Sequence, residues 1–277
     1  MSVERPGALI DLRSTIRRRS LRALFSLVEP ALDRMLGIGA INRVYAQALA
    51  TREQERFFPA VLRAMDVNYL VSDAERARIP SHGAVIVVAN HPFGGIDGLI
   101  LGDILTRARR DARILANQLL LRIPEIRPWI IAVDADARPS SARANIRSMR
   151  RVIRWTRDGG LIGIFPSGTV SHLRLGSGVH DPAWHPNVAA LVRMTGATVV
   201  PIYFEGQNSL PFQLAGLLHP GLRTLLLAAE AAKRRHSTVR VRVGCPLTQE
   251  LASRYPDDEA LIQYLRRQTY ALRASSI

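Results

Sequence analysis

A histidine and an aspartate are spaced for proton abstraction in the segment "VVANHPFGGIDGL", residues 87–99. His91 follows a β-branched apolar run, and a side chain at the end of such a strand is held by rigid backbone. Asp97, at the start of a helix-like stretch, could accept the imidazole Nδ1 proton and leave Nε2 to act as the base. The pair therefore predicts a site that removes a proton from an alcohol. The alternative is that Asp97 only caps its helix and that His91 fills a polar turn.

Two glycines separate this histidine from the aspartate. Gly94 and Gly95 allow a tight turn and let a substrate approach the backbone. The helix that starts near Asp97 would direct its N-terminus, which carries a partial positive charge, toward developing negative charge.

The elements that must position these residues form an alternating pattern. Short β-rich runs occur at 67–71, 84–90, 112–116, 129–134, 161–166, 198–204 and 238–244, and amphipathic helical patterns near 98–110, 140–157, 186–195, 210–235 and 257–273. Several runs are apolar without alternation, as in strands that are covered on both faces. We therefore expect an α/β fold with a largely parallel central sheet flanked by helices. An N-terminal helical segment, 1–65, would precede a catalytic domain, 66–277.

Ligand sites in such sheets gather at the loops that leave the carboxyl ends of strands. Three loops qualify: "NHPFGGID" (90–97), "FPSGTVSH" (165–172) and "PIYFEGQNS" (201–209). The sequence thus predicts that these loops build one site.

Charge and composition restrict the partners. The 277 residues carry a formal net charge of +15, and almost all the positive charge is arginine, which favours an anionic partner: nucleic acid, a membrane surface or an acidic substrate. The one cysteine, Cys245, excludes an intrachain disulfide, which is typical of a reducing environment. We expect neither a membrane span nor a secretory signal, because no apolar run reaches the required length.

The N-terminal segment resembles a basic amphipathic helix. Apolar residues recur at three- and four-residue spacing in 21–36, Arg13, Arg17, Arg18, Arg19 and Arg22 crowd the stretch before and within it, and a kink is expected at Pro30. Such a helix could lie in an anionic membrane interface, or it could pack as an ordinary first helix of the domain.

Together these motifs resemble the glycerolipid acyltransferases typified by 1-acylglycerol-3-phosphate acyltransferase. Asn90, His91 and Asp97 are similar to the family's N-H-x-x-x-x-D motif, with one extra residue in the interval. "FPSGT" (165–169) resembles F-P-E-G-T, and "VVPIYF" (199–204) resembles its V-P-[IV] strand. The resemblance covers about 67–247. A bacterial hemolysin-like or ornithine-lipid-type subgroup, with N-H-P-x-G-x-x-D, shares the longer interval.

The resemblance implies a mechanism and a set of site residues. His91 would deprotonate an acceptor hydroxyl, Asp97 would orient it, and the alkoxide would attack an acyl thioester of coenzyme A or acyl carrier protein as co-substrate, with no cofactor and no metal. The implied substrate-binding residues are Asn90, Phe93, Gly94, Gly95, Phe165, Pro166, Ser167, Gly168, Thr169 and Pro201. Pro201 could instead be a simple edge or turn proline. The expected location is peripheral, on the cytoplasmic face of the inner membrane.

Three departures from the family pattern concern the acceptor. Ser167 replaces the glutamate of F-P-E-G-T, and Val170 and Ala135 stand where arginines would lie. Phosphate recognition normally uses positioned arginines. The sequence therefore favours a lysolipid without a phosphomonoester, such as lyso-ornithine lipid. Lysophosphatidate is the alternative, in which Arg138, Arg143 or Arg174 would replace the missing contacts.

Other functions are less well supported by the residues. His172, His180 and His185 follow the "FPSGT" block, but their spacing matches no metal-ligand pattern, and His185 could cap a helix or contact an acceptor. A serine hydrolase would use Ser167 or Ser171, yet no G-x-S-x-G elbow is present. A nucleic-acid-binding protein would explain the charge, yet a stacking platform, a helix-turn-helix and a phosphate loop are missing from the sequence. We therefore expect no nucleic-acid partner.

Overall fold

The computed structural model describes residues 9, 29–51, 57–134, 139–174 and 176–274. The chain divides into two compact units. The smaller unit is drawn from Met1–Asn68, Phe93–Leu99 and Asn208–Thr238, and the larger one from Tyr69–Pro92, Ile100–Gln207 and Val239–Ile277. The backbone therefore crosses from one unit to the other five times.

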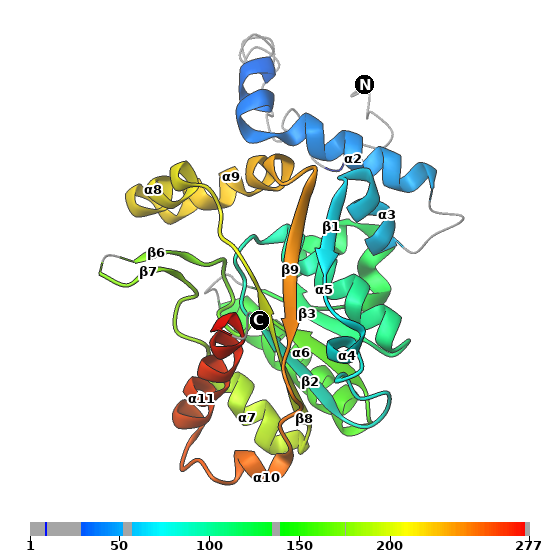
Figure 1. The fold of residues 1–277 in the computed structure, drawn as a ribbon, viewed down its shortest axis with the longest axis vertical. Helices are drawn as coiled ribbons and strands as arrows, with labels where there is room; N and C mark the ends of the chain where they lie inside the picture. Colours follow the sequence, from blue (N-terminus) through cyan, green and yellow to red (C-terminus); the bar gives the residue numbers. More distant parts are fainter. Residues whose placement is uncertain (1–8, 10–28, 52–56, 135–138, 175, 275–277) are drawn as a thin grey trace. The chain divides into compact units, whose positions relative to one another are not determined.

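A seven-stranded sheet in the order β1-β9-β8-β2-β5-β3-β4 forms the framework of the described residues (Figure 1). The strands are β1 (Val67–Leu70), β2 (Val85–Ala89), β3 (Arg113–Asn117), β4 (Ile130–Val133), β5 (Leu161–Ile164), β8 (Thr198–Phe204) and β9 (Ser237–Val243). Strand β2 pairs in parallel with β5 and β8, and β3 pairs in parallel with β4 and β5, whereas β9 runs antiparallel to β8. The predicted α/β fold with a largely parallel sheet is confirmed, and each predicted run is a strand of it.

Burial explains why the central strands are apolar throughout. Every residue of β2 and β5 is buried, because both faces of the sheet are covered. Side chains alternate along a strand, so Ile162 and Ile164 of β5 point to one face and Gly163 to the other. A Cβ at Gly163 would lie 2.7 Å from Leu105 of α5 (Gly95–Ala108), which shows how closely this helix approaches the sheet.

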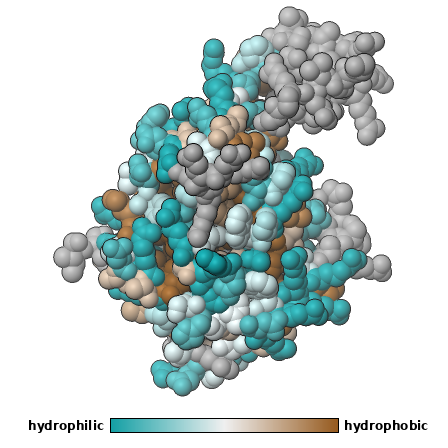
Figure 2. All heavy atoms as spheres, turned by 90° about the vertical axis from the view of Figure 1, so that its right-hand side faces the viewer, coloured by the Kyte–Doolittle hydropathy of each residue, from teal (hydrophilic) through white to brown (hydrophobic). Residues whose placement is uncertain are grey.

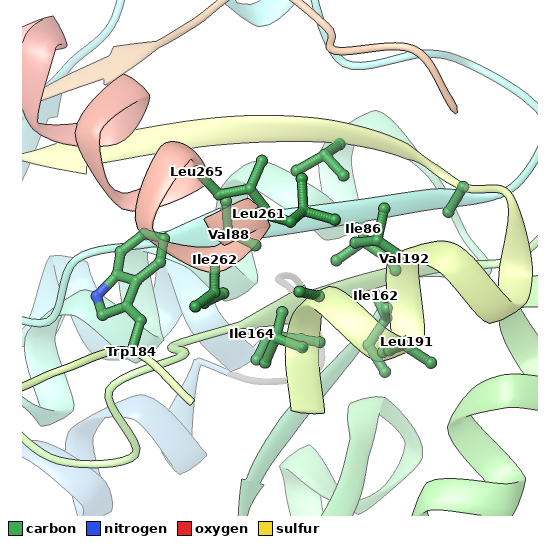
Figure 3. Close-up of a cluster of buried hydrophobic side chains, with 14 of the residues drawn as sticks. Ile86, Val88, Ile162, Ile164, Trp184, Leu191, Val192, Leu261, Ile262 and Leu265 are labelled. Carbon is green, nitrogen blue, oxygen red and sulfur yellow. The ribbon is translucent and has the colours of Figure 1, made fainter. Parts of the chain in front are cut away.

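Three helices supply the core on the face of Ile162 and Ile164. They are α6 (Pro139–Arg157), α7 (Pro186–Thr195) and α11 (Asp258–Ala271). Figure 3 shows side chains of α7 and α11 packed against those of β2 and β5, with Trp184 beside them. This close-packed cluster gives the carboxyl ends of the strands a rigid base.

The helical pattern at 210–235 was expected to be continuous, and this prediction is wrong. It forms two helices, α8 (Leu210–Leu218) and α9 (Pro220–Lys233). Pro220 has no N–H and a fixed φ, so it suits the first position of a new helix rather than the interior of one. The side chain of His219 accepts a hydrogen bond from the N–H of Gly221 and caps α9.

Several short elements were not predicted from the sequence. They are the antiparallel hairpin of β6 (His172–Arg174) and β7 (Gly178–His180), the helices α4 (Asp73–Arg76) and α10 (Gln249–Ala252), and the 3-10 helices η2 (Gln118–Arg122), η3 (Pro124–Trp129) and η4 (Leu272–Ala274). Each spans six residues or fewer, too short for a periodic pattern to identify.

The smaller unit is helical. Besides α8 and α9 it contains helical residues 29–36, α2 (Ile38–Ala50) and α3 (Phe57–Ala64). Gly37 has a φ of 69°, and a Cβ there would lie 2.8 Å from the Cα of Ala229, so the turn before α2 packs directly on α9. The described part of the N-terminal segment is thus helical as expected. The arginine-rich stretch at 13–22 lies outside the described residues, and the boundary at 65/66 stays a prediction.

None of the helices within the described ranges is both long and apolar enough to cross a bilayer.

Candidate functional site

Three loops meet at one edge of the sheet in the larger unit. Strands β8, β2 and β5 are adjacent and parallel, so their carboxyl ends lie side by side. The residues that follow them are 90–92, 165–171 and 205–207. The predicted convergence of these loops is confirmed, and it brings the His91 segment next to the "FPSGT" segment.

Asn90 links the ends of two of these strands. Its Nδ2 donates to the carbonyl of Phe204 at 2.9 Å, and its Oδ1 accepts from the N–H of Phe204 at 2.7 Å. The buried side-chain amide therefore continues the pairing of β2 with β8 beyond their last backbone contacts. This geometry gives Asn90 a positioning role, and a direct contact of Asn90 with substrate stays a prediction.

His91 is fixed through its backbone and its ring. Its N–H donates to Asp181 Oδ1 at 3.1 Å, and its carbonyl accepts from the N–H of Ser171 at 2.8 Å. The imidazole stacks on the ring of Phe165, with centroids 4.0 Å apart and an interplanar angle of 23°. A half-buried imidazole held in this way is suited to accept a proton from a substrate in one direction.

Asp181 is a buried carboxylate at this site that the sequence did not identify. Besides the His91 N–H, Oδ1 accepts from the hydroxyl of Ser171, and Oδ2 accepts from Trp184 Nε1 at 2.9 Å. The N–H of Asp181 donates to the hydroxyl of Tyr270 at 2.9 Å. Burial, with the negative charge of Asp181, raises the pKa of Tyr270, so this hydroxyl stays protonated. Because such charge-assisted bonds are strong, the group fixes the backbone on which His91 lies.

The "FPSGT" loop forms a tight turn after β5. Gly168 has a φ of 64° and donates its N–H to the carbonyl of Phe165 at 3.0 Å. Ser167 Oγ donates to the carbonyl of Thr169 at 2.8 Å. Pro166 is buried, and Gly168 and Thr169 are exposed. The loop therefore offers backbone and a small hydroxyl at the surface, which suits a role in shaping an acceptor site.

Asp97 is held within the smaller unit. Its Oδ2 accepts from the N–H groups of Phe93 and Gly94 at 2.8 and 2.9 Å, and the side chain is buried. Gly94 has a φ of 86°, a conformation that glycine adopts readily, whereas Gly95 begins α5 and is exposed. The carboxylate thus reaches back from the first helical turn and caps the helix, as the alternative interpretation predicted. Capping is compatible with a catalytic role, because it fixes the carboxylate.

Arg234 is a second residue that sequence patterns did not indicate. Its guanidinium lies 4.2 Å from the ring centroid of Phe93, in the arrangement of a cation–π contact. Burial lowers the pKa of Arg234, and the charges of Glu230 and Asp97 oppose this effect. The loop that carries Asp97 is therefore packed beneath a cation from the end of α9.

Pro201 lies in the interior of β8, a strand with neighbours on both sides. The interpretation of Pro201 as an edge or turn proline is wrong. Its ring is accommodated by Gly244, where a Cβ would lie 2.7 Å from Pro201 Cγ. Pro201 is paired in register with Val88, upstream of the loops at the sheet edge.

The three downstream histidines are distributed over separate elements. His172 and His180 face each other in the register of the β6–β7 hairpin, and His185 occupies the N-cap position of α7 without a side-chain capping bond. Within the described part of the chain, no group of three or more His, Cys, Asp or Glu side chains is arranged to hold a metal. Ser171 is buried with its hydroxyl bonded to Asp181, which is unfavourable for a hydrolase nucleophile.

The order of these motifs along one sheet edge agrees with a family comparison. A family model described as "Acyltransferase" matches residues 22–276. The chain belongs to this family, as the resemblance of its motifs predicted, and it is an enzyme that transfers acyl groups.

Individual relatives are more specific. The chain is 27% identical over 228 residues to a lyso-glycine lipid O-acyltransferase of Phocaeicola vulgatus, covering 78% of this chain and 77% of the relative. It is 26% identical over 229 residues to the protein of the same name in Bacteroides thetaiotaomicron, covering 78% and 79%. A solved structure, the 1-acyl-sn-glycerophosphate acyltransferase PlsC from Thermotoga maritima, matches with a TM-score of 0.49 and 18% identity over 95% of this chain and 97% of that one.

Proposed function

We propose that this chain transfers a fatty acyl group from an acyl thioester, carried by coenzyme A or acyl carrier protein, to a hydroxyl group of a lysolipid. The observation that carries the proposal is the ring of His91, held against Phe165 at the carboxyl ends of the central strands. The relatives named as lysolipid O-acyltransferases support the choice of acceptor class.

In the proposed mechanism His91 is the general base. Its Nε2 takes the proton of the acceptor hydroxyl while the oxygen attacks the thioester carbonyl. The tetrahedral intermediate then collapses with cleavage of the carbon–sulfur bond, and the proton on His91 passes to the departing thiolate. The products are an ester and a free thiol, and no acyl-enzyme forms. Asp97 would orient the imidazole and stabilise its protonated form.

The acceptor that we propose has an amino-acid head group, of the ornithine or glycine type, rather than a phosphomonoester. Val170, which stands where the family pattern would place an arginine, is buried and cannot offer a cation. Losing charge-assisted hydrogen bonds at about 1.5–3 kcal/mol each would disfavour a dianionic phosphate. The names of the two bacterial relatives support the same class.

The proposed working location is the cytoplasmic face of the inner membrane, where thioester donors and lysolipids are both present. The net charge of +15 supports peripheral attachment to an anionic surface.

The test is an acyl-transfer assay of the purified full chain with one thioester donor and three acceptors in parallel: lyso-ornithine lipid, lyso-glycine lipid and lysophosphatidate. We expect kcat/KM to be at least about 10-fold higher for an amino-acid acceptor, equivalent to about 1.4 kcal/mol. A preference for lysophosphatidate that is lost on replacing Arg174 would contradict the proposed head group. No transfer to any of the three would contradict the function itself.

A further inference from the structure

Helices α8 and α9 of the smaller unit form a hairpin with an apolar surface. Six of the exposed large apolar side chains in the described ranges belong to it: Leu210, Leu214, Leu217, Leu218, Leu222 and Leu225. The four in α8 are spaced at three and four residues and therefore lie on one side of that helix. Leu218 is 82% exposed. A continuous group of exposed leucines is typical of an interaction surface.

Exposed apolar side chains elsewhere are more dispersed. The face drawn in Figure 2 carries mainly hydrophilic and intermediate residues, with separate hydrophobic areas between them. Single exposed apolar residues are normal on a protein surface, so the hairpin is distinguished by the clustering of its leucines.

The charges of the hairpin are of one sign. Residues 209–229 contain no aspartate or glutamate, and Arg223 is their only charged residue. The methylene groups of Arg223 lie against Gly216 of α8, where an added Cβ would collide with them, and burial lowers the pKa of Arg223. An arginine whose stem lies along apolar surface can extend its charged end to the level of lipid phosphates.

A buried carboxylate fixes the base of the hairpin. Glu230 accepts from the N–H and the hydroxyl of Ser209 at 2.8 and 2.7 Å, and from Lys233 Nζ at 2.7 Å. The start of α8 and the end of α9 are thereby tied together. The next residue after α9 is Arg234, which stacks on Phe93 in the loop that Asp97 holds. The hairpin and the aspartate loop therefore belong to one connected unit.

We propose that the α8–α9 hairpin is the surface by which this protein docks on an anionic lipid bilayer, with the leucines among the acyl chains and Arg223 at the phosphates. The inference rests on the proposed function, because a lysolipid acceptor resides in the bilayer. At nine and fourteen residues the two helices are suited to lie in the interface.

Charge favours a bilayer over a second copy of the chain as the occupant. Residues 209–235 carry four cations (Arg223, Lys233, Arg234 and Arg235) and one acid (Glu230), a net charge of +3. A symmetric dimer through this surface would bring two such sets together, and like charges repel. An anionic membrane neutralises them.

The experiment compares two double variants of the full chain. In the first, Leu214→Glu and Leu218→Glu place two charges on the hairpin. In the matched control, Ile146→Glu and Met194→Glu introduce the same charge at side chains of the larger unit that are 53% and 49% exposed. Sedimentation with vesicles of phosphatidylglycerol and phosphatidylethanolamine measures binding, and thermal unfolding verifies that each variant is folded.

We expect the hairpin variant to bind these vesicles about 100-fold or more weakly, and the control to bind within about twofold of the unchanged chain. Equal binding of both variants would overturn the proposal. So would a shift of the hairpin variant from dimer to monomer in lipid-free buffer with vesicle binding unchanged. The vesicles contain neither donor nor acceptor, so failure of docking and failure of acyl transfer are separate results.

Discussion

The imidazole of His91 and the phenyl ring of Phe165 are stacked at a centroid distance of 4.0 Å, although the two residues come from different strand ends. Phe165 in turn lies 6.4 Å from the ring of Phe204, at the end of a third strand. The proposed base is thus supported by an aromatic series that runs across three neighbouring strands. Its direction depends on the sheet as well as on its own loop.

Replacing Phe165 with leucine should reduce kcat more than it raises KM. The smaller side chain keeps the site apolar but removes the flat surface against which the imidazole lies, and a displacement of about 1 Å can cost about 100-fold in rate. Steady-state kinetics with a lysolipid acceptor measures the effect. A Phe165→Tyr control preserves the flat ring and should retain most of the activity. Loss of activity in both variants would show that stacking is not the property that matters.

His91→Ala and Asp97→Ala should each lower kcat/KM by about 10²–10⁴-fold, because each removes part of one proton-transfer unit. The double variant should be little worse than His91→Ala alone, since residues that act as a unit are not additive. Kinetics of the three purified variants measures this. Full activity of folded His91→Ala would contradict the role of this residue as base.

Asp181→Asn should impair both stability and catalysis. The variant turns one acceptor oxygen into a donor against groups that already donate, and hydrogen bonds to a charged group contribute about 1.5–3 kcal/mol each. Ser171→Ala is the milder control, because it removes one hydroxyl and keeps the backbone bond from residue 171 to His91. Urea unfolding gives the stability, and kcat measured well below the unfolding midpoint gives the catalytic effect. An Asp181→Asn protein with unchanged kcat would show that the buried carboxylate is structural only.

The stability contributed by Glu230 should depend on pH. Burial alone would raise the pKa of Glu230, but hydrogen bonds from Lys233 and Ser209 lower it below its ordinary value of 4.5. Since the folded pKa is the lower one, the contribution is present above pH 4.5 and is lost as the pH falls through the folded pKa. Denaturant unfolding of Glu230→Gln and the unchanged chain from neutral pH to about pH 3 should show curves that converge in acid. A constant difference would contradict this linkage.

Charge reversal at Arg17, Arg18, Arg19 and Arg22 should weaken sedimentation with anionic vesicles, because each basic residue near such a surface contributes about 1 kcal/mol. Substitution is preferable to deletion of residues 1–36, since Leu36 is buried and its removal would disturb the smaller unit. Vesicle binding that does not change would assign the N-terminal stretch to packing.

The sequence predicted the sheet well because its central strands are buried on both faces, so that β2 and β5 consist of uninterrupted apolar runs. His91 was predicted at a strand end for the same reason. The break at Pro220 was missed although a proline inside a helical pattern indicates one.

Asp181 could not be identified in this way, because its importance comes from partners far along the chain. His91 lies 90 residues before it and Tyr270 lies 89 residues after it. Arg234 was missed for the same reason: its contact with Phe93 depends on the packing of α9. A polar residue in a loop shows no periodicity, and only the assembled fold reveals that Asp181 is buried.

The alternation of the chain between its two units affects the order in which the molecule can be completed during synthesis. A nascent chain that has reached Gln207 already contains β2, β5 and β8, and the loop of His91 can be placed between them. The unit that holds Asp97 still lacks α8 and α9, which complete it only when residue 238 has left the ribosome. The base is therefore in position before the aspartate loop acquires its packing, so that premature termination between these points would yield a sheet with an inactive centre.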